Sequence, residues 1–394
     1  MRFTCLNLQL VLLLATQLTG CMVGQNFHAQ PSPKVDSYTA TPLGKKTVQT
    51  TKNGVGKSQR FMVGADIPAD WWHLYHSPQL NALIERGLAN SPTLASAQAA
   101  LRQADEALIA QIGNSLFPAI NGVFSGERQQ FAGSTLNNDF PNSIFNLFNA
   151  TVNVTYTLDV FGGSRRQIEA MRAAVNYQQY ELIASYLTLT SNIATTAVTV
   201  AAFNEKIIAT KALVKAQRDQ LKIIRQQFEM GGASQENVLS QQTLVEQTAA
   251  TIPAYEQGLA QAQHALAVLV GELPNTQLPI IKLSDFNLPA NIPVSVPSNL
   301  VNQRPDVQAS SALLHYASAE IGVATANLLP QVTLTGAYGW SGGAPSSLLQ
   351  AVNKTGNYGG SLTQPFFHGG ALFAARRQAI AAYDQAFASY KQTV

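Results

Sequence analysis

Two stretches of sequence decide the fold, and they read alike: Leu116-Phe117-Pro118 followed by AINGVFSGER, and Leu328-Leu329-Pro330 followed by QVTLTGAYGW. Before each stretch, an alanine-rich segment with helical spacing begins at a proline, Pro92 in one case and Pro305 in the other. In both, a proline ends the expected helix and a segment with strand-like alternation begins. Because this unusual unit occurs twice, the sequence predicts an internal two-fold repeat.

Each copy then returns through a second expected strand to a glycine pair, Gly162-Gly163 or Gly369-Gly370, where a long helix begins. The repeat is therefore helix, strand, strand, long helix. The expected strands are residues 119–128, 151–159, 331–340 and 358–366. We expect a first repeat over residues 71–298 and a second, incomplete one over 299–394.

The strands 151–159 and 331–340 alternate between apolar and polar residues, so each has one face of either kind. The apolar set is Val152, Val154, Tyr156, Leu158, Val332, Leu334, Tyr338 and Trp340. The polar set is Asn153, Thr155, Thr157, Thr333 and Thr335. Nine or ten residues with aromatic ends suit a tilted strand that crosses a bilayer, so we expect the first set to face lipid and the second an aqueous lumen.

The alternation alone leaves open an ordinary half-buried soluble sheet. If the strands do span the membrane, four of them cannot close a barrel, and their free edges would lie unpaired in hydrocarbon. Several chains must then share one barrel. The fold class expected is an α+β membrane protein.

The long helix shows a coiled-coil pattern, because apolar residues recur every seven positions. They are Tyr186, Ile193, Val200, Ile207, Val214, Leu221 and Phe228. A similar series returns through residues 238–266, so the sequence predicts a helical hairpin over 164–270, followed by a non-helical segment over 271–298. Gly231, Gly232, Ala233 and Ser234 form its expected tip, with Ser234 capping the return helix. Pro253 is expected to bend that helix.

The amino terminus reads as a secretory signal over residues 1–20. Arg2 precedes a short apolar run, and Leu18-Thr19-Gly20-Cys21 has the small residues of a lipoprotein cleavage site, which predicts a lipid on Cys21. An uncleaved anchor is disfavoured because the run is too short to span a bilayer. Residues 21–70 then form an expected extended arm.

Composition excludes several classes of function. A net charge of +3 on 394 residues, with scattered basic residues, gives no nucleic-acid surface. Gly54-Val55-Gly56-Lys57-Ser58 lacks the first glycine of a phosphate-binding loop. His73 and His76 have no third metal ligand nearby, and no carboxylates cluster, so we expect no enzyme, no metal and no cofactor.

Several motifs together resemble the TolC-like outer-membrane efflux proteins, in their NodT-type lipoprotein branch. They are Cys21-Met22-Val23-Gly24, Ile252-Pro253-Ala254, Leu266-Ala267-Val268-Leu269-Val270-Gly271, Arg304-Pro305-Asp306-Val307, Ile321-Gly322-Val323-Ala324 and Gln364-Pro365-Phe366-Phe367-His368-Gly369-Gly370. The resemblance implies a homotrimer in the cell outer membrane, with four strands per chain in a shared 12-stranded barrel and a periplasmic helical tunnel. The implied partners are a periplasmic adaptor and an inner-membrane pump of the resistance-nodulation-division class.

The function expected is passive export of small molecules through the duct, driven by the pump. Two alternatives remain: a type I duct for secreted proteins, and a periplasmic coiled-coil adaptor or scaffold lipoprotein. A full second repeat would reach about position 478, whereas the sequence ends at Val394, so we expect a fragment that lacks the periplasmic gate. In such a fragment, Ile207 and Leu221 are expected to lose their packing partners.

Overall fold

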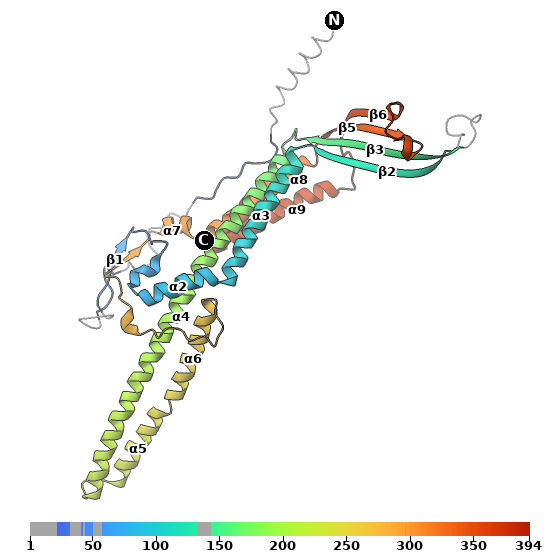
Figure 1. The fold of residues 1–394 in the computed structure, drawn as a ribbon. Helices are drawn as coiled ribbons and strands as arrows, with labels where there is room; N and C mark the ends of the chain where they lie inside the picture. Colours follow the sequence, from blue (N-terminus) through green and yellow to red (C-terminus); the bar gives the residue numbers. More distant parts are fainter. Residues whose placement is uncertain (1–21, 32–40, 42–43, 50–56, 132–142, 296) are drawn as a thin grey trace. The chain divides into compact units, whose positions relative to one another are not determined.

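The computed structural model describes residues 22–31, 41, 44–49, 57–131, 143–295 and 297–394, traced in Figure 1. The chain divides into two compact units, which are considered separately. The first unit consists of residues 1–31, 101–179 and 306–394, and the second of residues 32–100 and 180–305. Two helices, α3 (Pro92–Leu116) and α4 (Gly163–Glu229), contribute one part to each unit.

The first unit contains a four-stranded antiparallel sheet in the order β2-β3-β5-β6 (Figure 1). The strands are β2 (Ala119–Phe131), β3 (Ser143–Leu158), β5 (Gln331–Gly342) and β6 (Lys354–Thr363). Among the described residues, the outer edges of β2 and β6 have no strand beside them. This sheet therefore presents two free edges.

The sequence located all four strands, although the expected bounds differ from the observed ones, most of all for β3 and β6. β3 was expected to begin at Thr151 and begins at Ser143, because its first eight residues pair with β2 up to Phe131. β6 was expected over residues 358–366 and covers 354–363. It ends there because Pro365 has no N–H for the ladder. Just before it, the side-chain amide of Gln364 donates to the Leu328 carbonyl at 3.2 Å.

The same order of elements occurs twice, as α3-β2-β3-α4 and as α8 (Pro305–Ala326)-β5-β6-α9 (Ala371–Thr393). Small residues bring α8 against α4, since a Cβ on Gly163 would lie 2.9 Å from the Ala326 Cβ atom. Along α8, Ala309, Ala317 and Ala319 are buried. The alanine-rich segment of α8 is thus a packing surface in the first unit.

The second unit has a small parallel sheet and a hydrophobic core around α4. β1 (Arg60–Val63) pairs with β4 (Asn291–Val294). The short elements are η2 (Trp71–Tyr75), α2 (Pro78–Asn90), η4 (Leu283–Asp285) and α7 (Pro297–Gln303). Leu80, Leu83 and Ile84 of α2 pack in this core with Ile193 of α4, and Ser77 caps α2 by accepting from the Leu80 N–H at 3.4 Å.

The return limb of the hairpin is made of α5 (Gln235–Ala249) and α6 (Ile252–Leu269). The heptad prediction is confirmed from Ile193 to Leu221, where Ile193, Val200 and Val214 are buried along α4. The last predicted member, Phe228, is exposed. The prediction of one bent return helix was wrong, because the return limb consists of two separate helices. Pro253 lies in the first turn of α6, where a backbone N–H has no partner within the helix and its absence therefore costs no hydrogen bond.

Two further heptad residues correct an expectation. Ile207 and Leu221 were expected to lose their packing partners, but both are buried. Leu221 packs with Val214 of α4 and Val245 of α5. The hairpin covers its own seam because the return limb presents a matching apolar series.

Candidate functional site

Apolar side chains gather on one face of the four-stranded sheet. Directly opposite residues of antiparallel strands point to the same side. Val152 lies opposite Tyr338, Tyr156 opposite Leu334, and Leu158 opposite Val332. The predicted apolar set therefore shares a face, which we call the apolar face.

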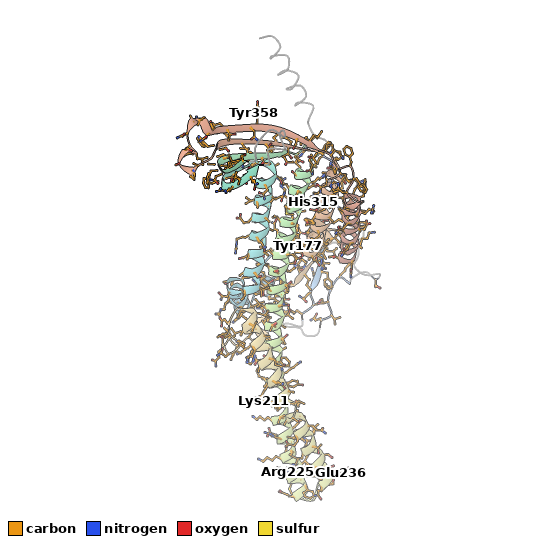
Figure 2. The ribbon with its side chains drawn as sticks, turned by 90° about the vertical axis from the view of Figure 1, so that its right-hand side faces the viewer. Tyr177, Lys211, Arg225, Glu236, His315 and Tyr358 are labelled. Atoms are coloured by element: carbon orange, nitrogen blue, oxygen red, sulfur yellow. The ribbon has the colours of Figure 1, made fainter. Side chains whose placement is uncertain are left out.

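The edge strands extend the apolar face. Ile120 of β2 lies opposite Val154, and Leu362 of β6 lies opposite Val332. Tyr358 is 97% exposed and projects from β6 in Figure 2. A shallow hollow of about 660 Å³ in this region is lined by Val152, Val154, Tyr338, Tyr358 and their neighbours. A contiguous apolar surface of this kind, which the described residues leave uncovered, marks contact with lipid or protein.

The other side of the sheet, which we call the polar face, carries mainly neutral hydrogen-bonding groups, with one carboxylate, that of Glu127, in β2. Thr155 lies opposite Thr335, and the hydroxyls of Thr157 and Thr333 are 3.3 Å apart. Farther along, the amide of Asn149 donates to the Ser125 hydroxyl at 3.3 Å. The predicted polar set is thus brought together on one surface.

A polar crevice of about 220 Å³ lies where the sheet meets the helices of the first unit. Its lining includes Thr157 of the polar face, together with Gln111 and Ser115 of α3, Gln167 of α4 and Asn327 just after α8. Thr157 thus belongs both to the polar face and to the lining of this crevice.

Asp159, which also lines the crevice, organises the start of α4. Its carboxylate accepts from the N–H groups of Ser164 and Arg165, both at 3.0 Å. An anion here is favoured by the unpaired N–H groups and the positive end of the helix dipole. This contact fixes the turn that joins β3 to α4.

One carboxyl group adjoins the crevice residues. Gln167 of α4 donates to Glu320 of α8 at 3.4 Å. Burial raises the pKa of Glu320, although hydrogen bonds from Gln167 and Tyr316 oppose that effect. At about 100° per residue, Glu320 and Gly322 project from nearly opposite sides of α8.

On the side of α8 that carries Gly322, a buried cation binds the amino-terminal arm. Arg166 of α4 is only 1% exposed, and its Nη1 donates to Glu169 at 2.7 Å. Burial alone would raise the pKa of Glu169, but hydrogen bonds from His315 and Arg166 outweigh it and lower that pKa. The resulting stabilisation is present above the ordinary carboxyl pKa of about 4.3 and is lost as the pH falls through the lowered value.

The hairpin tip in the second unit is a tight, solvent-exposed turn. Gly231 has a φ of 76°, the left-handed conformation that ends many helices, and the N–H of Gly232 donates to the Gln227 carbonyl at 2.7 Å. Ser234 caps α5 by accepting from the Asn237 N–H at 3.3 Å. Figure 2 shows Arg225 and Glu236 near this closed end. The predicted tip residues thus form a turn at the end of the hairpin.

The remaining sequence features are the two histidines His73 and His76, the candidate metal ligands and spanning helices, and the lipidation motif. His73 lies 4.0 Å from Asp70, and His76 ends η2 in the left-handed conformation. Within the described ranges, no three metal-binding side chains gather. None of the helices in those ranges is both long and apolar enough to cross a membrane. Cys21 lies outside the described residues, so its predicted lipid stays a prediction.

The two repeats, the hairpin and the two-faced sheet agree with a comparison against known families. A sequence model described as outer membrane efflux protein matches residues 83–272 and 296–394. The chain belongs to this family. The coiled-coil adaptor alternative is therefore set aside, and this efflux protein has a transport function at the outer membrane.

Named relatives and a solved structure agree with the assignment. The efflux protein is 27% identical to the pyoverdine export outer membrane protein OpmQ of Pseudomonas aeruginosa, over 96% of this chain and 77% of OpmQ. It is 26% identical to nodulation protein T of Rhizobium leguminosarum bv. viciae, over 96% of this chain and 73% of that protein. The outer-membrane channel OprN has the same fold, with a TM-score of 0.81 at 23% identity over 94% of this chain and 79% of OprN.

Sequence reasoning missed Arg166, Asp159 and Glu320 of the efflux protein. One signal was available: Arg165-Arg166 places two cations in the first turn of a helix, where the dipole disfavours them. Such residues need specific partners, which here are Asp159 for Arg165 and Glu169 with the arm for Arg166. Glu320 carried no comparable signal in the sequence.

Proposed function

We propose that this efflux protein is the passive exit duct of a tripartite assembly for small molecules. Three copies would each contribute four strands to a shared 12-stranded barrel. The observation that carries this proposal is the sheet with one apolar face, one polar face and two free edges among the described residues. Strands buried in hydrocarbon require a partner at every edge, and copies of the same chain supply one.

The route for solutes would follow the polar face and the crevice. Neutral hydroxyl and amide groups can form hydrogen bonds with a passing solute without holding it tightly. Such weak contacts suit diffusion that is driven by a pump elsewhere. Because the arm binds on the opposite side of α8, we assign the Glu320 side to the lumen and the arm side to the outer surface. The inner-membrane pump would supply both the energy and the choice of substrate.

The duct would be tethered by a lipid on Cys21. The motif Leu18-Thr19-Gly20-Cys21 supports this modification, which anchors a protein without a spanning helix. Mass spectrometry of the mature amino-terminal peptide is expected to show a diacylglyceryl group and a further acyl chain on Cys21. An unmodified chain that still begins at Met1 in purified membranes would refute the anchor and leave the assignment of the duct intact.

The hairpin tip would meet a periplasmic adaptor. Its turn of small residues permits close approach of another backbone, as docking of two hairpin ends requires. We expect Gly232→Cys and Ser234→Cys to cross-link to the adaptor in cells that assemble the pump. Lys211→Cys, on the same hairpin away from the tip, and Tyr338→Cys on the sheet are the controls. Cross-linking that is equally strong at the tip and at Tyr338 would contradict the proposed orientation and the exit-duct function.

A further inference from the structure

The segment Met22–His28 occupies a built site between α4 and α8 in the first unit. Its backbone begins at the turn before α4, where the Val23 N–H donates to the Phe161 carbonyl at 3.0 Å. A Cβ on Gly162 would lie 2.6 Å from the Met22 side chain, so these two residues are in close contact. The segment is therefore held from its first described residue.

Arg166 holds the middle of the segment. Its Nε donates to the Val23 carbonyl at 3.0 Å, and its Nη2 donates to the Gly24 carbonyl at 3.1 Å and to the Asn26 side chain at 2.9 Å. Three of its four hydrogen bonds thus go to the arm, and the fourth goes to Glu169. Without the arm, a buried guanidinium would lose three acceptors, which is far costlier than losing a surface ion pair.

Backbone contact explains the glycines at the site. Gly24 has a φ of 89°, and a Cβ there would lie 2.9 Å from the Gly322 Cα atom of α8. A Cβ on Gly322 would in turn lie 2.8 Å from the Arg166 side chain. The arm can approach α8 this closely because both positions lack a side chain.

A ring stack closes the end of the segment. Phe27 stacks on His315 of α8 with a centroid distance of 4.4 Å and an angle of 10° between the rings. The Nε2 atom of His315 lies 2.9 Å from Glu169, the same carboxylate that pairs with Arg166. The arm is thus bound at three places: the turn at Phe161, the guanidinium and the ring of His315, which Figure 2 labels on α8.

We propose that Arg166 is a positioning residue that docks Met22–His28 and so fixes the lipid-bearing terminus at the start of α4, where β3 has just ended. An undocked segment of seven residues could extend over roughly 25 Å, and the lipid could then move over that distance relative to α4. Docking removes this freedom of movement, so the attached lipid and the end of the sheet are held at the same depth relative to the membrane. The consequence for the lipid rests on the proposed function, whereas the docking itself does not.

The test measures the mobility of the arm in the full-length chain. A nitroxide on Ala29→Cys, in a background that carries Cys5→Ser and Cys21→Ser and so has no other thiol, reports the segment just beyond the contacts. We expect an immobilised spectrum in the parent protein and a several-fold shorter rotational correlation time after Arg166→Met, which keeps an unbranched apolar stem but removes the guanidinium and its donors. Arg165→Met, whose partner is Asp159, is the matched control and is expected to leave the label immobile.

A second variant keeps the proposal falsifiable if Arg166→Met fails to fold. Gly24→Ala alters only the arm and is expected to mobilise the label by the clash with Gly322 while the helix content stays constant. A label that is already mobile in the parent protein, or one that stays immobile in every variant that folds, would overturn the proposal. Because this readout uses protein without the lipid, a failure of the predicted lipidation cannot be mistaken for a failure of docking.

Discussion

Replacing Val154 by arginine is expected to abolish assembly of the efflux protein in the outer membrane. Val154 lies in the central strand β3, on the apolar face, opposite Ile120 and Gly336. An arginine that faces lipid near the middle of the bilayer costs about 2–4 kcal/mol, a factor of ~30 to ~1000 in the folded population, and each copy in an assembly would bear that cost. The measurement is the amount of assembled protein in the outer-membrane fraction.

The matched control for this variant is Thr155→Arg, one residue farther along the same strand and on the polar face. We expect this variant to assemble and to change transport instead, because its charge would enter the aqueous path. If both arginines prevent assembly equally, the distinction between the two faces is wrong. If only Thr155→Arg does so, the faces have been assigned in the reverse sense.

Truncation of Ile193 to alanine is expected to destabilise the hairpin unit by about 2–5 kcal/mol, the usual cost of a cavity in a packed core. Ile193 is fully buried in the core between α2 and α4, and the Gly87 backbone lies directly against its side chain. Thermal unfolding followed by circular dichroism in detergent measures the change.

The control for the packing effect is Ile208→Ala on the same helix. Ile208 is 59% exposed in the chain, so its truncation leaves no buried cavity and is expected to change stability by less than about 1 kcal/mol. Equal losses from the two substitutions would show that the heptad seam does not carry the stability of this unit.

The sequence predicted the elements that depend on local patterns. The period of seven along α4 located the buried seam, because only a residue that returns to the same side of a helix can pack on its partner throughout. The alternation in β3 and β5 likewise assigned residues such as Val152 and Thr155 to their faces correctly, since cross-strand pairing preserves it. Both signals repeat many times and tolerate errors at single positions.

Contacts between distant segments escaped prediction. The first eight residues of β3 read as a loop, and only their pairing with the far end of β2 makes them a strand. The arm read as an unstructured linker, although Val23, Gly24 and Asn26 supply the acceptors that a buried Arg166 needs more than 130 residues later. No local pattern encodes a partnership over such a separation, even where an unusual cation in a first helical turn shows that one is needed.

The central claim is that one face of the sheet contacts lipid while the other lines water, and spin-label accessibility along β3 tests it most directly. Single nitroxides at positions 152 to 157, in a background that carries Cys5→Ser and Cys21→Ser, are compared for collisions with oxygen, which concentrates in lipid, and with a water-soluble nickel complex. We predict high oxygen accessibility at 152, 154 and 156 and high nickel accessibility at 153, 155 and 157. Low accessibility to both reagents at the even positions, as in the core of a soluble sheet, or no alternation at all, would contradict the account.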